Sequence, residues 1–187
     1  MTELLTQHLP EGSFEATPAA DGMPTVYVPR ERLVDTMRAL HDLPALGYTF
    51  LADICAVDYI PREPRFEAVY LLAHLGGAGG AGARRLRVKV RVPGADPTVP
   101  TVAGIWPGAS WAERELWDLF GIRVDGHPDL RRILMPEDWD GFPGRRDYPV
   151  QIKQPVKTYE PLQVSEEEFV SNIEASRDRA RRFKTNG

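Results

Sequence analysis

The residues whose types and spacing best suit chemistry lie between Glu113 and His127. Three carboxylates, Glu113, Glu115 and Asp118, occupy a short stretch that His127 follows. Paired carboxylates can act as acid and base when their surroundings separate their pKa values. Arginines occur in the same stretch, however, and ion pairing explains the carboxylates more simply. We therefore favour a structural role for this cluster over acid–base catalysis.

A glycine pattern, Gly77-x-Gly79-x-x-Gly82, matches the fingerprint of dinucleotide-binding proteins. That fingerprint works where it joins a strand to a helix, because the helix N-terminus then meets the pyrophosphate. Here the next segment, residues 85–92, alternates apolar and basic side chains as a strand does. The pattern indicates a flexible connection between two strands, not a nucleotide site.

The sequence lacks the residues that metal binding and thiol chemistry require. Cys55 is the single cysteine, and one thiol cannot form an internal disulfide or hold a four-thiolate iron–sulfur cluster. No histidine spacing resembles a metal site, and no serine lies in a nucleophile elbow. We therefore expect no catalytic residue, no bound cofactor and no metal ligand. The four histidines lie far apart, at His8, His41, His74 and His127.

The strand at residues 85–92 raises nucleic-acid binding as an alternative. Its basic side chains point to one face at period two, opposite an apolar face. The net charge of −4 gives no basic field, and the stacking platform of single-strand binders is missing. We expect the basic face to meet solvent or an acidic partner. Its members are Arg85, Arg87, Lys89 and Arg91.

The sequence predicts no membrane-spanning segment. No apolar run approaches the roughly 20 residues that a helix needs to cross a bilayer. The first residues lack a basic start followed by an apolar stretch, so we expect no signal peptide. The chain is expected to be cytosolic or bound to a membrane through partners.

An α+β domain is predicted for residues 1–120, with a small, mostly antiparallel sheet and covering helices. Apolar residues at helical spacing between 30 and 43, after Pro29, predict the main covering helix. Residues 10–24 are typical of a loop. The expected strands are 25–28, 48–59, 66–75 and 85–92, and the expected helices are 2–9, 30–43 and 111–120, with a helical turn at 98–105.

The predicted helix at 111–120 carries its own start and stop signals. Ser110 and Glu113 form a capping box, and Gly121 provides a left-handed stop. Arg114 and Asp118 are spaced for an ion pair along the helix. These features are structural and require no function.

Residues 121–164 break the globular pattern and are interpreted as an extended, proline-rich arm. Prolines and glycines are frequent, yet bulky apolar residues persist, which is untypical of disorder. We expect such an arm to lie across another surface, with folding back on its own sheet as the alternative. Residues 165–187 are predicted to form a C-terminal helical tail, with Ser165 as the cap.

Large aromatics interleaved with charges of both signs, between Trp111 and Trp139, are typical of a surface that another protein covers. The charges from Arg131 to Asp147 balance, which suits a specific protein contact. The predicted interface residues are Glu113, Arg114, Glu115, Asp118, His127, Arg131, Arg132, Asp138, Trp139, Arg145, Arg146, Asp147 and Tyr148.

The same residues carry a family resemblance. ERELWDLFGI at 113–122, GHPDLRRILMPEDW at 126–139 and the element Asp147-Tyr148-Pro149 resemble the C subunit of the proton-pumping NADH:quinone oxidoreductase, respiratory complex I. The specific match covers residues 106–149. Residues 142–146 depart from it, because the family often has a histidine and a leucine there. The glycine-rich stretch 76–83 looks like a local insertion.

The resemblance implies a peripheral, non-catalytic subunit of the hydrophilic arm, on the cytoplasmic side of the cell membrane. The complex would couple electron transfer from NADH to quinone to proton translocation. NADH, FMN, iron–sulfur clusters and quinone would be bound by neighbouring subunits. The implied neighbours are the terminal iron–sulfur cluster subunit and the large quinone-site subunit. Membership of a related membrane-bound hydrogenase-type complex is the alternative that the resemblance allows.

Three hypotheses follow for experiment. An assembly subunit predicts that substituting Arg131 or Arg132 impairs assembly while the isolated domain still folds. A free-standing enzyme predicts turnover that depends on Glu113, Glu115 or Asp118. A nucleic-acid binder predicts binding of duplex or single strands through residues 85–91.

Overall fold

The computed structural model describes residues 2–76, 82–149 and 165–185. The chain divides into two compact units, Met1–Pro149 and Val150–Gly187. The sequence instead predicts boundaries after residues 120 and 164. The first unit contains the sheet and the predicted interface residues, and the second contains helix α4 (Glu166–Thr185).

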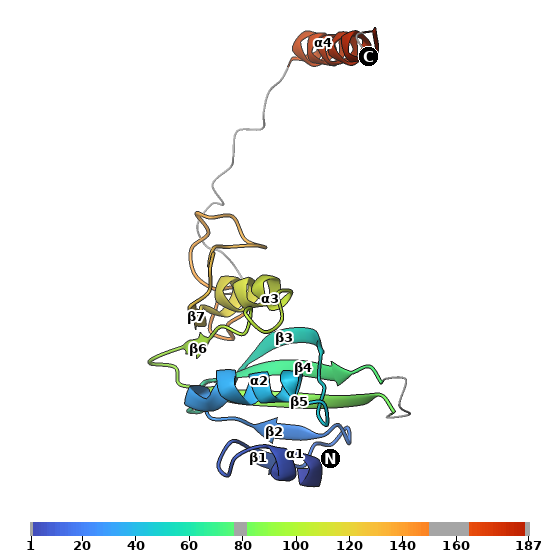
Figure 1. Cartoon of the computed structure of the whole chain (residues 1–187). Coiled ribbons are helices and arrows are strands. Elements are labelled where there is room, and N and C mark those ends of the chain that lie inside the picture. The colour runs from blue at the N-terminus through green and yellow to red at the C-terminus, as the bar shows by residue number, and fades with distance from the viewer. Residues whose placement is uncertain (1, 77–81, 150–164, 186–187) are drawn as a thin grey trace. The chain divides into compact units, whose positions relative to one another are not determined.

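The first unit is built on a five-stranded sheet in its described part (Figure 1). Neighbouring strands run antiparallel except β2 and β5, which are parallel. The α+β fold with a mostly antiparallel sheet is therefore as predicted. In order of pairing the strands are β1 (Glu15–Thr17), β2 (Thr25–Tyr27), β5 (Arg84–Val92), β4 (Phe66–His74) and β3 (Phe50–Asp58).

Alternation along β5 fixes which face of the sheet is buried. Leu86, Val88, Val90 and Val92 are fully buried, while the residues between them lie on the opposite face. Antiparallel register places Val88 opposite Tyr70 of β4, whose side chain is also buried. The period-two pattern thus predicted both the strand and its apolar side correctly.

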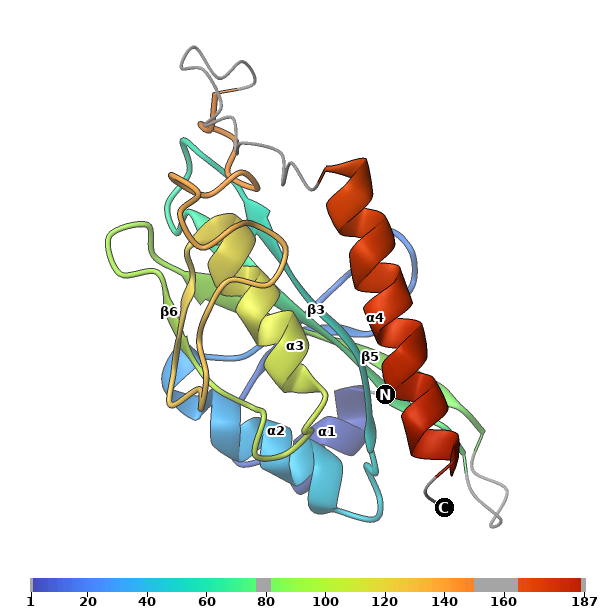
Figure 2. The same ribbon diagram turned by 90° about the horizontal axis from the view of Figure 1, so that it is seen from above.

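Helices cover this apolar face, as Figure 2 shows from above. Leu5, Met37 and Leu116 share one hydrophobic core with the buried strand residues. They belong to successive helical segments along the chain. These segments are α1 (Thr2–His8), η1 (Arg30–Arg32) with α2 (Leu33–Asp42), and α3 (Ala109–Glu115) with η2 (Leu116–Phe120).

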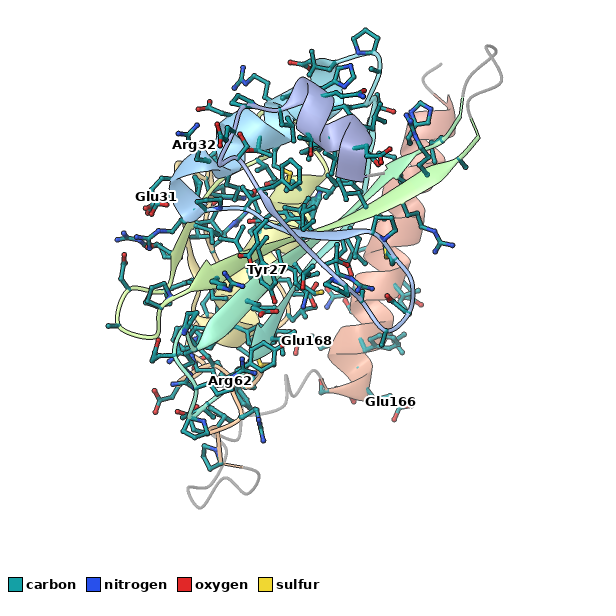
Figure 3. All side chains as sticks on the ribbon, turned by 90° about the horizontal axis from the view of Figure 1, so that it is seen from below. Tyr27, Glu31, Arg32, Arg62, Glu166 and Glu168 are labelled. Atoms are coloured by element: carbon teal, nitrogen blue, oxygen red, sulfur yellow. The ribbon has the colours of Figure 1, made fainter. Side chains whose placement is uncertain are left out.

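The opposite face of the sheet carries the basic stripe of β5. Lys89 lies 2.9 Å from Glu67, and Arg91 lies 3.3 Å from Glu15. Arg87 pairs with Asp21. The charges of these three basic residues are therefore met by acids of the same chain. Figure 3 shows Tyr27 near the middle of this face.

Two expectations for irregular segments were wrong. Residues 15–17, predicted as loop, form β1, and the predicted helical turn at 98–105 begins instead with strand β6 (Thr98–Pro100). Strand β6 pairs in parallel with β7 (Arg123–Asp125), so Val99 and Val124 are both buried. Its partner lies far along the chain, and a three-residue strand gives no periodicity of its own.

Helix α3 starts at Ala109, and its N-cap Gly108 makes no side-chain hydrogen bond. The predicted capping box is wrong, because Ser110 lies inside the helix and Glu113 bonds elsewhere. The predicted stop is correct: after the π-helical turn η2, Gly121 adopts φ 67°. Left-handed backbone of this kind favours glycine.

The second unit contains α4, which begins after Ser165 as predicted. The Ser165 hydroxyl accepts a hydrogen bond from the Glu168 amide at 3.2 Å. In the described part of the chain, no helix is long and apolar enough to cross a membrane. Residues 150–164 of the expected arm, and most of the glycine-rich stretch, lie outside the described residues.

Candidate functional site

Asp118 makes the central hydrogen bonds that hold residues 121–149 to the rest of the domain. Its side chain is fully buried, and one carboxylate oxygen, Oδ2, accepts three successive backbone amides. Burial alone would raise its pKa, but these amides and Arg132 outweigh burial and lower it. Asp118 is thus a satisfied buried anion. The amides belong to Ile133 at 3.0 Å, Leu134 at 2.6 Å and Met135 at 2.8 Å.

Arg132 completes this arrangement from within the segment. Its guanidinium donates to Asp118 Oδ1 at 2.7 Å and to the Asp118 carbonyl at 3.1 Å. The other terminal nitrogen donates to the carbonyl oxygens of Trp139 and Gly141. One mostly buried arginine therefore joins η2 to two parts of the following loop.

Arg114 makes a parallel set of contacts one helical turn earlier. It donates to the carbonyl oxygens of Arg131 at 3.1 Å and Arg132 at 2.7 Å. The predicted ion pair between Arg114 and Asp118 is wrong, because each of the two groups binds residues 131–135 instead. The helix and the loop are joined by bonds that no spacing within the helix could predict.

Glu113, on α3, is fully buried and faces the turn that follows β6. Its carboxylate accepts hydrogen bonds from the Val102 amide and the Thr101 hydroxyl, both at 2.6 Å. Burial raises its pKa, and these hydrogen bonds offset burial only in part. Glu113 fixes the turn after β6 against α3.

His127 lies beside this carboxylate, with its Nε2 3.9 Å from Glu113 Oε2. The same nitrogen lies 3.0 Å from the Ser110 hydroxyl and 3.1 Å from the Ser110 carbonyl oxygen. Because Nδ1 accepts the Asp129 amide, the proton of the neutral ring lies on Nε2. The side chain of His127 is fully enclosed and anchors the loop after β7 to α3.

A second set of contacts holds the segment near its end, at residues 146 and 147. The buried Asp58, at the end of β3, binds the Arg65 guanidinium and accepts the Arg146 amide at 3.0 Å. Arg65 also pairs with Asp147 at 2.7 Å. Burial would raise the pKa of Asp58, but hydrogen bonds from Arg65, Arg146 and Ile60 lower it to about 2.

Arg145 and Tyr148, on either side of residues 146 and 147, add further contacts. Arg145 donates to the Phe120 carbonyl at 2.6 Å and stacks on Phe142, with 4.6 Å between guanidinium and ring. The Tyr148 hydroxyl donates to the Asp140 carbonyl at 3.1 Å. Residues 121–149 therefore fold back on their own domain, whereas the sequence favoured an arm lying across another surface and gave folding back as the alternative.

The predicted interface residues thus divide into two groups. Most of them hold the segment to its own domain: Glu113, Arg114, Asp118, His127, Arg132, Arg145 and Tyr148. Others present exposed side chains at the surface: Glu115, Arg131, Asp138, Arg146 and Asp147, with Trp139 half-buried between the groups.

Several residues of this region were not predicted. Asp58 lies just before the turn that the sequence places at 60–65, and Arg65 ends it; their opposite charges at its two ends were the available signal. Trp111 begins the predicted helix outside its apolar stripe, within the stretch that the sequence assigns to a covered surface, and 64% of it is exposed. Leu134 is 57% exposed. Only the folded segment reveals that these two apolar side chains remain uncovered.

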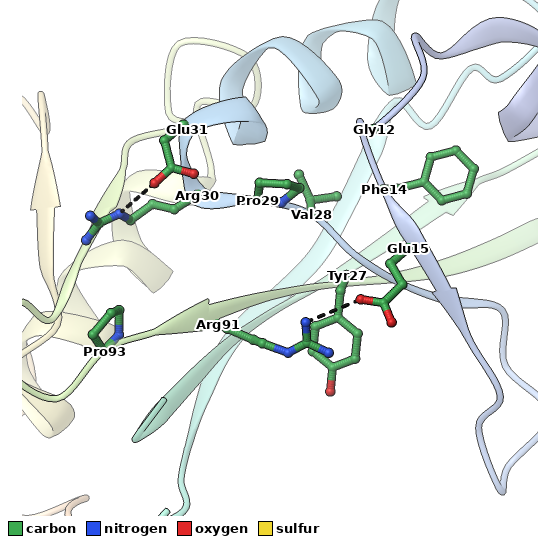
Figure 4. A pocket seen from close by; sticks show the side chains of 10 residues that line it. All are labelled: Gly12, Phe14, Glu15, Tyr27, Val28, Pro29, Arg30, Glu31, Arg91 and Pro93. Carbon is green, nitrogen blue, oxygen red and sulfur yellow. Dashed lines mark hydrogen bonds and ion pairs between the residues drawn. The ribbon is translucent and has the colours of Figure 1, made fainter. Parts of the chain in front are cut away.

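The geometry offers little to a free-standing enzyme. Glu113 and Asp118 are both bound by structural partners and point to different loops. A cavity of about 500 Å³ lies elsewhere, between β1, β2 and β5 (Figure 4). There Arg91 lies 3.9 Å over the Tyr27 ring and pairs with Glu15. Among the described residues, no group of three or more His, Cys, Asp or Glu side chains is arranged for a metal ion.

Known proteins resemble this chain over most of its length. The family described as "Respiratory-chain NADH dehydrogenase, 30 Kd subunit" matches residues 26–154. That range contains both the sheet and the folded-back segment, apart from β1.

Curated relatives carry consistent names. The second C subunit of the NADH-quinone oxidoreductase of Rhizobium meliloti (strain 1021) is 49% identical over 140 residues, covering 75% of this chain and 74% of the relative. The C subunit of the same enzyme of Roseiflexus sp. (strain RS-1) is 47% identical over 135 residues, covering 72% and 75%. NADH-quinone oxidoreductase subunit 5 of Thermus thermophilus is 47% identical over 129 residues, covering 67% and 61%.

Two solved structures share the fold. The trypsin-resistant fragment of Nqo5 is 38% identical with a TM-score of 0.58, covering 69% of this chain and 95% of the fragment. A chain of the archaeal membrane-bound sulfane sulfur reductase is 22% identical with a TM-score of 0.64, covering 87% and 96%. The latter likeness concerns the fold alone.

Proposed function

The chain belongs to the family of the respiratory-chain NADH dehydrogenase 30 kDa subunit, and we propose that it serves as the C subunit of a membrane-bound NADH:quinone oxidoreductase. The observation that carries this proposal is the match over residues 26–154, supported by relatives that are 47–49% identical and named as such subunits. The complex transfers electrons from NADH to quinone and couples this transfer to proton translocation.

The role that we propose for the chain is to position its neighbours. Residues 121–149 are folded onto the domain by buried ionic contacts at both ends, which fixes the surface that this segment presents. A fixed surface can hold a partner without an ordering cost at each association. NADH, FMN, iron–sulfur clusters and quinone would be bound by neighbouring subunits, at the cytoplasmic side of the cell membrane.

The proposed neighbours are the subunit that holds the terminal iron–sulfur cluster and the large subunit at the quinone site. Exposed charged residues of the segment suit the rim of such a contact, because rim charges select the partner more than they add affinity. Arg131 is such a residue of the segment, and the exposed Glu115 of α3 adds to it.

A gentle purification from membranes tests this function. The full chain is tagged and extracted in mild detergent, and the co-purifying chains are identified by mass spectrometry. We expect both proposed neighbours in near-equal amounts, together with NADH:quinone activity. Recovery of the tagged chain alone, or with chains unrelated to an NADH dehydrogenase, would contradict the proposal.

A further inference from the structure

We propose that Trp111 and Leu134 form the apolar centre of a docking surface for a basic segment of a neighbouring subunit. The inference rests on the proposed function and names the chemistry of one partner. Within the first unit, only a few large apolar side chains of described residues are exposed to this extent. Exposed tryptophans on a rigid surface are frequent anchors of protein–protein binding.

Trp111 and Leu134 are linked indirectly, through the contacts that join α3 and η2 to residues 131–134. Trp111 stacks on Arg114, with 5.3 Å between guanidinium and ring. Arg114 donates to the carbonyl oxygens of residues 131 and 132, and the Leu134 amide is bound by Asp118. The surface is therefore preorganised: the backbone beneath both side chains is held before any partner arrives.

Exposed acidic side chains lie close in sequence to both apolar residues. Glu115 lies one helical turn after Trp111 on the same exposed face. Glu137 and Asp140 are exposed, and Arg132 draws the neighbouring carbonyls of Trp139 and Gly141 toward the segment that bears Leu134.

The arginines near Trp111 and Leu134 interact with groups of the same chain. Arg131 pairs with Asp129 at 2.9 Å, and Arg114 is half-buried against two carbonyl oxygens. The exposed charges near Trp111 and Leu134 therefore include the acids Glu115, Glu137 and Asp140, while Arg131 is paired and Arg114 is held by backbone oxygens.

This charge distribution decides between possible occupants. An isologous contact between two copies would bring like acidic rims together, which opposes association. Anionic lipid would be repelled by the same rim. A partner segment with apolar side chains flanked by lysine or arginine satisfies both the centre and the rim.

Site-specific photo-cross-linking identifies the occupant. A photoreactive amino acid replaces Trp111 in the full tagged chain within the membrane complex, and the same replacement at Leu75, which is 66% exposed, is the control. We expect position 111 alone to cross-link to another subunit, at a segment with Lys or Arg beside apolar residues. Cross-linking to a second copy, to lipid or to an acidic segment, or none in an assembled complex, would overturn the inference.

Variants give a quantitative test of the same surface. We expect Trp111→Ala and Leu134→Ala each to lower recovery of the assembled complex at least about tenfold at limiting expression, as anchor residues do. Glu137→Lys should lower it as well, whereas Leu75→Ala should leave it unchanged. Circular dichroism of each purified chain must match wild type, so that loss of folding is not mistaken for loss of docking.

The outcomes separate this inference from the proposed function. If wild-type chain fails to co-purify with subunits of an NADH dehydrogenase, the proposed function is contradicted. If wild-type chain co-purifies and Trp111→Ala and Leu134→Ala do so equally well, the docking surface alone is contradicted.

Discussion

Asp118 explains why the segment after α3 is ordered although it contains little regular structure. A buried carboxylate is costly unless hydrogen bonds and an opposite charge satisfy it. Here the backbone amides of residues 133–135 and the guanidinium of Arg132 supply both. At the residue scale, a set of charges that looked suited to catalysis or to a partner is used mainly to fold the chain.

Removing the carboxylate should therefore weaken the fold itself. We expect Asp118→Ala to lower the free energy of unfolding by about 3 kcal/mol, because it leaves three amides and a buried guanidinium without their acceptor. Urea denaturation of the purified chain measures the change. Glu115→Ala, an exposed acid on the same helix, is the matched control. Equal stability of the Asp118→Ala and wild-type chains would refute this role.

The neighbouring arginines should differ although they are adjacent in sequence. The side chain of Arg132 is 13% exposed, whereas that of Arg131 is 63% exposed. We expect Arg132→Ala to lower the free energy of unfolding by about 3 kcal/mol, since it leaves a buried carboxylate with less support. Arg131→Ala should change it by less than about 1 kcal/mol, as for other surface pairs.

This comparison refines the hypothesis drawn from sequence, which treated both arginines as contacts needed only for assembly. Assembly of the complex, measured on native gels, should depend on Arg131 without a change in folding. Dependence on Arg132 should follow the stability of the chain. If both variants unfold like wild type, the structural role assigned to Arg132 is wrong.

At the scale of elements, residues 121–149 are fastened at both ends. Asp118 and Arg132 hold the part nearer to α3, while Asp58 and Arg65 at the β3–β4 turn hold residues 146 and 147. Removing the contacts at one of these two places should leave the contacts at the other intact. Hydrogen exchange can therefore assign each fastening to its own portion of the segment.

The Asp58 fastening should make stability depend on acid pH. Its folded pKa of about 2 lies below the unfolded value of 3.8, so the ionised carboxylate stabilises the folded state. This contribution, about 2 kcal/mol, is present above about pH 4 and is lost as pH falls toward 2. Asp58→Asn should lower stability at about pH 6 and match wild type near pH 2.

Denaturant unfolding at several pH values tests this dependence. Asp147→Asn is the control, because Asp147 is half-exposed and should contribute well under about 1 kcal/mol. An Asp58→Asn chain that retains the full acid dependence of wild type would show that other carboxylates are responsible.

Gly121 sets the direction in which the segment leaves the helix. A Cβ there would lie 2.6 Å from both the Arg145 guanidinium and the Phe142 ring, and φ is 67°. We expect Gly121→Ala to cost at least about 2 kcal/mol, from left-handed strain and these clashes. Gly104→Ala, where nothing lies within 4 Å, should cost less than about 1 kcal/mol. Thermal unfolding of both variants makes the comparison.

Sequence predicted the elements whose signals are local. The alternation in β5, the apolar spacing in α2 and the glycine stop at Gly121 all correspond to the structure. It failed where the decisive partner is distant, as for β6, whose pairing with β7 cannot be read from three residues.

The site shows the same limit. Spacing suggested that Ser110 caps the helix through Glu113 and that Arg114 pairs with Asp118. Each group instead binds a loop distant from it in the chain. Tertiary contacts with buried charge outweigh the few tenths of a kcal/mol that a helical ion pair offers.

For the molecule as a whole, the first unit combines a sheet covered on one face with a folded-back segment that presents exposed Trp111 and Leu134. The family match spans both parts together, at residues 26–154. The sheet domain and its segment therefore act as one platform in the proposed function. That platform is the part of the chain expected to be needed for the complex to assemble.

Deletion of the chain and its return on a plasmid test this central claim most directly. The quantity measured is inhibitor-sensitive NADH:quinone activity in membranes, normalised to the amount of the quinone-site subunit. The account predicts that activity is lost on deletion and restored by wild-type chain, but restored only weakly by a chain carrying Trp111→Ala and Leu134→Ala. Undiminished activity in membranes that lack the chain would contradict it.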